Sequence, residues 1–136
     1  MFRVILVTFF IFCPVSVHAF DGMAVELVRV VDGDTVIVNI AGWPDIVGHE
    51  IGVRVAGCDT PELRDKRPNI RAKAYEAKEA VFLLLNTAQT VELRNIRRGK
   101  YFRLVAEVYA DGTDIAIVLI GAGLAQPYDG GTRPSW

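Results

Sequence analysis

Residues 25–40 read VELVRVVDGDTVIVNI, and this stretch decides the fold. A β-branched run opens it and predicts one strand, and the apolar alternation over 35–40 predicts a second strand with one buried face. The Asp-Gly-Asp sequence between them interrupts the pattern as a turn does. After a loop over 41–45, residues 51–55 alternate again. The first part of the chain therefore predicts a three-stranded meander.

Further along, the apolar period changes from two residues to three and four. Residues 70–88 have this helical spacing, and Pro68 and Asn69 just before them suit a helix start.

Two more strands are predicted over 91–96 and 103–109, followed by a short helix that Thr113 or Asp114 can cap. Residues 127–136 are rich in turn-forming residues. The order indicates an α+β, mainly β protein. We expect a five-stranded OB-fold barrel, with one amphipathic helix between strands three and four and a short helix after strand five.

The first nineteen residues have the features of a secretory signal peptide. Arg3 supplies a positive charge, an apolar run follows over 4–15, and residues 17–19 have the small-x-small form of a cleavage site. The apolar run is shorter than the ~20 residues that a membrane span requires. We therefore expect cleavage after Ala19, a single domain over 20–136, no stable membrane association, and a secreted or periplasmic location.

The mature chain is expected to be slightly acidic. Without Arg3, 14 Lys and Arg residues stand against 16 Asp and Glu residues. Domains that hold nucleic acid through bulk charge are usually basic, so any attraction to phosphate has to be local. Basic residues do gather over 64–73 and 94–103, although solvated surfaces explain such groups equally well. Cys58 is the one mature cysteine, which excludes an internal disulfide, and it has the character of a small buried residue.

Asp34 and Asp59 both lie where a predicted strand meets a loop. If the two strands are neighbours, their carboxylates converge. Pro61 stiffens the second loop and holds Thr60 extended, so the carbonyl of Thr60 has a defined place. Two carboxylates, a carbonyl and water are hard oxygen ligands that suit calcium better than zinc. The ordinary alternative for Asp34 is a purely turn-forming role.

Two arginines accompany these acids. Arg54 is on the polar face of the third predicted strand, and Arg103 begins the fifth. Two guanidinium groups can grip one phosphate through paired hydrogen bonds, and both stay charged at any relevant pH. Phosphoryl transfer needs such charge neutralisation together with a positioned nucleophile. Surface ion pairs are the simpler explanation for both arginines.

Three blocks, in this order around one helix, resemble the staphylococcal nuclease (thermonuclease) family. They are VDGDTV at 31–36, RVAGCDTPE at 54–62 and KYFR at 100–103. The resemblance extends over about residues 25–126. It implies that Asp34 and Asp59 bind Ca²⁺ through their side chains and Thr60 through its carbonyl. It also implies that Glu62 orients or deprotonates the attacking water.

The same resemblance implies roles for the basic and aromatic residues. Arg54 and Arg103 would stabilise the five-coordinate phosphorus and its leaving oxygen. Lys100 and Tyr101 match positions that touch a terminal phosphate, and Tyr128 matches an aromatic residue that packs on the nucleotide. Family members cut DNA and RNA with little sequence preference and leave 3′-phosphate ends. We therefore expect an exported, Ca²⁺-dependent, monomeric nuclease acting on single-stranded or frayed DNA and RNA.

The sequence departs from the family pattern at two places. Phe102 stands where the family commonly has glycine, beside Arg103. The family also usually ends in a further helix: either residues 130–136 take its place, or that helix lies beyond Trp136. Two other functions stay open at this point. One is a non-catalytic OB-fold module that binds nucleic acid, and the other is a barrel that binds a peptide or small ligand.

Overall fold

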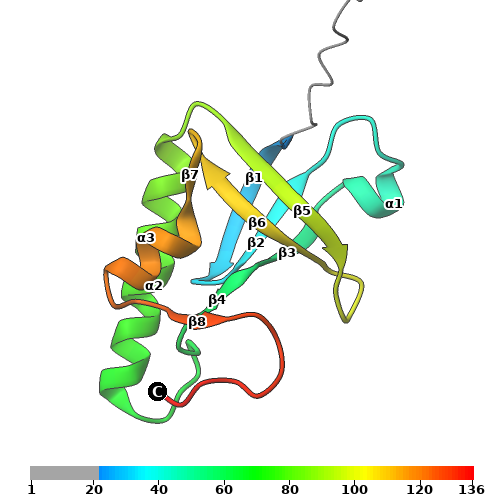
Figure 1. The fold of residues 1–136 in the computed structure, drawn as a ribbon. Coiled ribbons are helices and arrows are strands. Elements are labelled where there is room, and N and C mark those ends of the chain that lie inside the picture. Colours follow the sequence, from blue (N-terminus) through cyan, green and yellow to red (C-terminus); the bar gives the residue numbers. More distant parts are fainter. Residues whose placement is uncertain (1–21) are drawn as a thin grey trace, which may run out of the picture.

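A closed barrel of five strands forms the body of the molecule (Figure 1). The computed structural model describes residues 22–136, so the predicted signal peptide over 1–19 lies outside the described residues. The strands pair in the order β3-β2-β1-β5-β6, and a parallel pairing of β3 with β6 closes the barrel. The barrel confirms the predicted fold class. Its strands are β1 (Met23–Asp32), β2 (Thr35–Asn39), β3 (Ile51–Val55), β5 (Val91–Arg98) and β6 (Leu104–Ala110).

Two helices follow the predicted order, α2 (Pro68–Thr87) between β3 and β5 and α3 (Ile115–Gly121) after β6. Pro68 occupies the first turn of α2, where its missing N–H is not needed. Asp114 caps α3, because its Oδ1 accepts a hydrogen bond from the Ala116 N–H at 2.8 Å. Of the two predicted caps, Asp114 is therefore the residue used.

Four short elements lie outside the predicted pattern. A one-turn helix, α1 (Asp45–Gly48), begins at the end of the segment predicted as a loop. The others are strands of two or three residues: β4 (Gly57–Asp59), β7 (Thr113–Asp114) and β8 (Gln126–Tyr128). β4 pairs with β8, which ties the turn-rich tail to the loop that carries Asp59. Elements this short contain too few residues to show a period.

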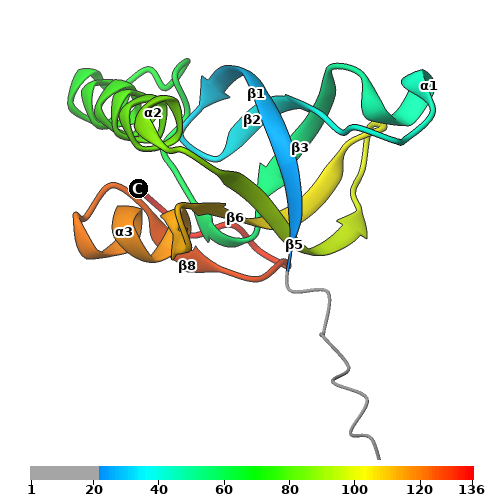
Figure 2. The same ribbon diagram turned by 90° about the horizontal axis from the view of Figure 1, so that it is seen from above.

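The core fills the barrel and the space beneath the two longer helices. Val36, Val38 and Val53 point inward and are fully buried, as their alternation predicts. In α2 the buried residues are Ala74, Ala77, Val81 and Leu85. In Figure 2, α2 and α3 lie on the same side of the barrel, and α1 lies on the opposite side.

The loop that contains α1 packs on the barrel through one aromatic side chain. Trp43 is half-buried against the core, whereas His49 is exposed at the end of α1, as expected of a loop residue. No helix within residues 22–136 combines the length and apolar character needed to cross a membrane.

Truncation of a barrel residue is expected to destabilise the protein. Leu93 on β5 is 1% exposed, so Leu93→Ala leaves a cavity in the core and should lower the free energy of unfolding by about 2–5 kcal/mol. Leu83→Ala is the matched control because Leu83 is 53% exposed on α2. Urea denaturation measures both, and equal losses for the two variants would contradict this account of the core.

The thiol of Cys58 is expected to be unreactive in the native protein. Burial, assisted by the nearby Asp34 carboxylate, raises its pKa to about 12, and Cys58 belongs to the core cluster. A thiol-specific reagent at pH 8 should therefore modify the chain of residues 20–136 only after denaturation, because the thiolate is the reactive form. Rapid modification of the folded protein would show that Cys58 is accessible.

Candidate functional site

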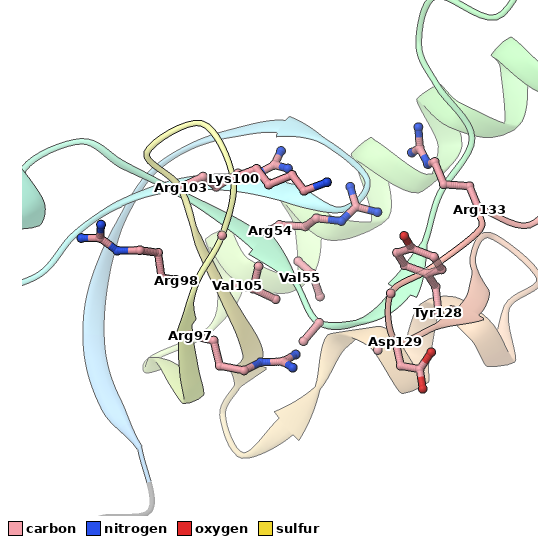
Figure 3. Close-up of a pocket in the computed structure, with 14 residues that line it drawn as sticks. Arg54, Val55, Arg97, Arg98, Lys100, Arg103, Val105, Tyr128, Asp129 and Arg133 are labelled. Carbon is pink, nitrogen blue, oxygen red and sulfur yellow. The ribbon is translucent and has the colours of Figure 1, made fainter.

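A cavity of about 530 Å³ opens between the end of β3, the β5–β6 loop and the chain that follows β8 (Figure 3). Asp129 is the one acidic residue among those that line it. A chain with a net charge of −1 thus presents a locally positive cavity, of the kind that attracts phosphate. The basic side chains that line it are Arg54, Arg97, Arg98, Lys100, Arg103 and Arg133.

Arg54 joins the two aspartates that were predicted to bind metal. Its Nη1 donates to Asp34 Oδ1 at 2.9 Å, and its Nη2 donates to Asp59 Oδ1 at 2.8 Å. Both aspartates are buried, and a buried charge needs a hydrogen-bonded partner of opposite sign. The carboxylates of Asp34 and Asp59 therefore do converge, as the placement of their strands predicted.

The turn between β1 and β2 holds Asp34 in place through close packing. A Cβ on Gly33 would lie 2.8 Å from both the Ala77 Cβ and the Thr60 Cγ2, so only glycine fits here. Two hydrogen bonds also hold Asp34 itself. The Asp34 carbonyl accepts a hydrogen bond from the Val55 N–H at 2.8 Å, and Asp34 Oδ2 accepts one from the Thr60 N–H at 3.0 Å.

The loop after β3 holds Asp59 and Thr60 by pairing with β8. Gly57, the first residue of β4, has a φ of +86°, which turns the chain away from β3. β4 then pairs with β8, with Asp59 opposite Gln126. Thr60 is buried, and its N–H donates to Asp34 Oδ2, so its backbone lies beside that carboxylate.

The chemistry of this acidic cluster fits a hard divalent cation. Carboxylate oxygens are the preferred ligands of Ca²⁺. Burial and, second to it, the neighbouring Asp34 carboxylate raise the pKa of Asp32 at this turn. Asp34 Oδ2 and Asp59 Oδ2 each accept one recorded hydrogen bond, so each keeps a lone pair. Within residues 22–136 no cluster of three or more His, Cys, Asp or Glu side chains is placed to bind a metal, so carbonyl and water ligands would complete the set.

Arg103 faces the same cavity as Arg54 because of the barrel closure. The parallel register places Val53 opposite Leu104 and Arg54 opposite Val105, so Arg103 lies beside Gly52, two residues before Arg54 on β3. Its side chain extends over Gly52, where a Cβ would be in ordinary van der Waals contact with the Arg103 Cγ at 3.6 Å. The Nε of Arg103 is buried and has no hydrogen-bond partner in the described part of the chain. Buried donors are nearly always satisfied, so this one is available to a ligand.

Glu62 follows Asp59 on the same loop, but its surroundings differ. Its side chain is 63% exposed, and Arg133 is its ion-pair partner, with Nη1 donating to Oε1. The Glu62 carboxylate therefore lies at the edge of the site, and the Arg133 side chain connects it to Asp59.

The C-terminal segment, residues 129–136, adds contacts that local sequence reasoning missed. Arg133 Nε donates to Asp59 Oδ1 at 2.9 Å, and the Trp136 indole N–H donates to Asp59 Oδ2 at 3.2 Å. These partners are 74 and 77 residues apart in the chain. Nothing in the local sequence of a Gly- and Pro-containing tail signals such a contact.

The three predicted substrate-binding residues do not all come together. Lys100 and Tyr128 line the cavity, and the Arg54 guanidinium lies 5.7 Å from the centre of the Tyr128 ring. Tyr101 is 92% exposed at the tip of the β5–β6 loop and does not line it. Tyr101 and Phe102 have φ values of +58° and +55°, which are unusual for side chains of their size.

Comparison with known proteins agrees with this arrangement. A family model described as "Staphylococcal nuclease homologue" matches residues 52–134. The SPbeta prophage-derived endonuclease YokF of Bacillus subtilis (strain 168) is 37% identical over 106 residues, which are 75% of this chain and 33% of YokF. Endonuclease YncB of the same organism is 36% identical over 106 residues, which are 75% of this chain and 46% of YncB.

This chain thus spans between a third and a half of the length of these two relatives. The range matched by the family model covers more than half of the chain and contains Arg54, Asp59, Glu62 and Arg103. On this evidence the chain belongs to the staphylococcal nuclease homologue family.

Proposed function

We propose that this chain is a divalent-metal-dependent nuclease that hydrolyses phosphodiester bonds in DNA and RNA. The observation that carries the proposal is one cavity in which Arg54 and Arg103 meet beside the converging carboxylates of Asp34 and Asp59. Family membership supports it, as do the names of two relatives, both of which are called endonucleases.

The two arginines suit the charge that develops on phosphorus. A guanidinium group has five N–H donors, and the recorded hydrogen bonds of Arg54 use one on each Nη. Its remaining donors and those of Arg103 can hydrogen-bond the non-bridging oxygens of a phosphate in the cavity. Because Asp34 and Asp59 already hold the Arg54 guanidinium, it needs little reorganisation when charge builds up in the transition state.

We assign Glu62 the role of general base, which accepts a proton from the attacking water. Its Oε1 is held by Arg133, and no protein donor is recorded for its Oε2 within residues 22–136. A water that attacks phosphorus can transfer its proton to this free oxygen as the new P–O bond forms. The bond from phosphorus to the 5′ oxygen then breaks, and that oxygen takes up a proton from solvent water. The products are a 3′-phosphate and a 5′-hydroxyl.

Asp34 and Asp59 are the residues that would hold the cation, with the Thr60 carbonyl and water completing the ligands. We propose Ca²⁺, since hard oxygen donors suit it and a set with few protein ligands suits the weak sites of extracellular proteins. A bound divalent cation supplies further neutralisation of charge on the phosphate oxygens. An exported protein, as residues 1–19 predict, would encounter calcium at concentrations that can fill such a site.

The lining of the cavity favours backbone recognition over base recognition. Arginine and lysine side chains contact phosphates irrespective of sequence, and Tyr128 offers a ring face on which any base can stack. We therefore propose single-stranded or frayed DNA and RNA as substrates, cut with little sequence preference.

Nuclease activity is tested by release of acid-soluble nucleotides from denatured DNA, with Ca²⁺, with Mg²⁺ and with chelator, using residues 20–136. We expect cutting that requires the metal. Glu62→Gln and Arg103→Ala should each lower kcat by about 10²–10³, because each removes one well-placed transition-state contact.

Arg29→Gln serves as the matched control, since Arg29 is an exposed arginine on β1 that does not line the cavity. A folded wild-type protein that binds denatured DNA in a salt-dependent manner but cuts it with neither metal would refute the proposal. The non-catalytic binding module would then describe this chain.

A further inference from the structure

We propose that Arg133 is a positioning residue for Glu62, which makes the C-terminal segment a part of the active site. The inference rests on the proposed function, because Glu62 acts on the water there. No role for Arg133 follows from the three sequence blocks, which all lie before residue 104.

Glu62 and Asp59 differ in how firmly the fold holds them. Asp59 is 1% exposed and is fixed by Arg54, by Trp136 and by the pairing of β4 with β8. Glu62 lies beyond Pro61 on an open loop, with most of its side chain in solvent. An exposed glutamate explores several rotamers, and ordering it has an entropic cost. A general base needs a defined place, so something has to restrain it.

Arg133 provides this restraint with its forked side chain. Its Nε and Nη2 lie 2.9 and 2.8 Å from Asp59 Oδ1, while its Nη1 donates to Glu62 Oε1. One planar guanidinium therefore links the exposed carboxylate of Glu62 to the buried carboxylate of Asp59. A lysine cannot make the same link, because an ammonium group is a point charge without the fork.

The geometry leaves Glu62 able to work. The contact engages Oε1 only, and Oε2 has no recorded protein donor in the described residues, so it is free to accept from water. An isolated exposed ion pair contributes little to stability. This pair differs because its guanidinium is also anchored on a buried carboxylate, so its main effect falls on position.

Trp136 keeps Arg133 in this place. Its indole N–H donates to Asp59, and the Lys73 amino group lies 5.8 Å from the centre of its ring. The side-chain amide of Gln126 donates to the Ser135 carbonyl at 2.9 Å, which fixes the chain between them. The pairing of β8 with β4 before Arg133, and the contacts of Ser135 and Trp136 after it, thus hold this part of the chain against the loop of Asp59.

Kinetics separate positioning from direct phosphate binding. Arg133→Gln should lower kcat on denatured DNA about ten- to a hundredfold, since displacement of a catalytic group by ~1 Å costs up to ~10² in rate. KM should change by less than about threefold, because a positioning residue adds no ground-state contact to the substrate. Arg133→Lys should fall between wild type and Arg133→Gln. Arg29→Gln again controls for loss of one positive charge.

The decisive experiment introduces Arg133→Gln into a protein that already carries Glu62→Gln. If Arg133 acts through Glu62, the double variant Arg133→Gln/Glu62→Gln should cut no more slowly than Glu62→Gln alone. Multiplicative losses, or a KM that rises while kcat holds, would overturn the proposal and make Arg133 a phosphate ligand instead.

A second readout needs no catalysis. In a Trp43→Phe background, Trp136 is the single tryptophan, so its fluorescence reports on the C-terminal segment. Arg133→Gln should increase quenching by acrylamide, and Arg29→Gln should not. Glu62→Gln and Arg133→Gln should also be coupled in stability: the shift of the urea midpoint in the double variant should differ from the sum of the two single shifts. If wild-type protein fails to cut DNA but shows this coupling, the proposed function fails and the contact stands. If neither coupling nor quenching changes, Arg133 does not position Glu62.

Discussion

Two buried carboxylates share one guanidinium in this protein, and the site is built around that pairing. Without Arg54, Asp34 would lose the guanidinium that pairs with it and Asp59 would be left with Arg133, so buried negative charge would lack compensation at a cost of several kcal/mol per ion. The same contacts fix the direction of the guanidinium, whose remaining donors serve the cavity. The interaction that makes the acidic cluster tolerable to the fold is therefore also the one that orients a phosphate-binding group.

Barrel closure brings the second arginine to the first. β3 and β6 are far apart in sequence, and their parallel pairing sets Arg54 and Arg103 at neighbouring positions on one wall. A parallel pair needs a long crossover connection, which α2, β5 and the intervening turns supply. The helix therefore both covers the core and forms part of the connection between the two paired strands.

Charge in this protein is a local property. The whole chain carries a net charge of −1, yet six basic side chains line one cavity and three acids lie just beside it. Arg54 and Arg133 each contact two members of this acidic group, so the basic and acidic surfaces meet along shared ion pairs. Such an arrangement favours phosphate at one point without the bulk positive field of a typical nucleic-acid-binding domain.

The sequence by itself determined the barrel strands, the long helix and the placement of Asp34 and Asp59 where strands meet loops. These features have local signatures: alternation, helical spacing, and acids at strand ends next to Gly33 and Pro61. Only the tertiary structure decided the pairing of β4 with β8, the one-turn α1, and the contacts of Arg133 and Trp136 with Asp59. Those contacts join residues more than seventy positions apart, and an arginine in a turn-rich tail looks locally like any solvated side chain. A period can be seen in a short window of sequence, whereas a long-range pair exists only once the chain has closed.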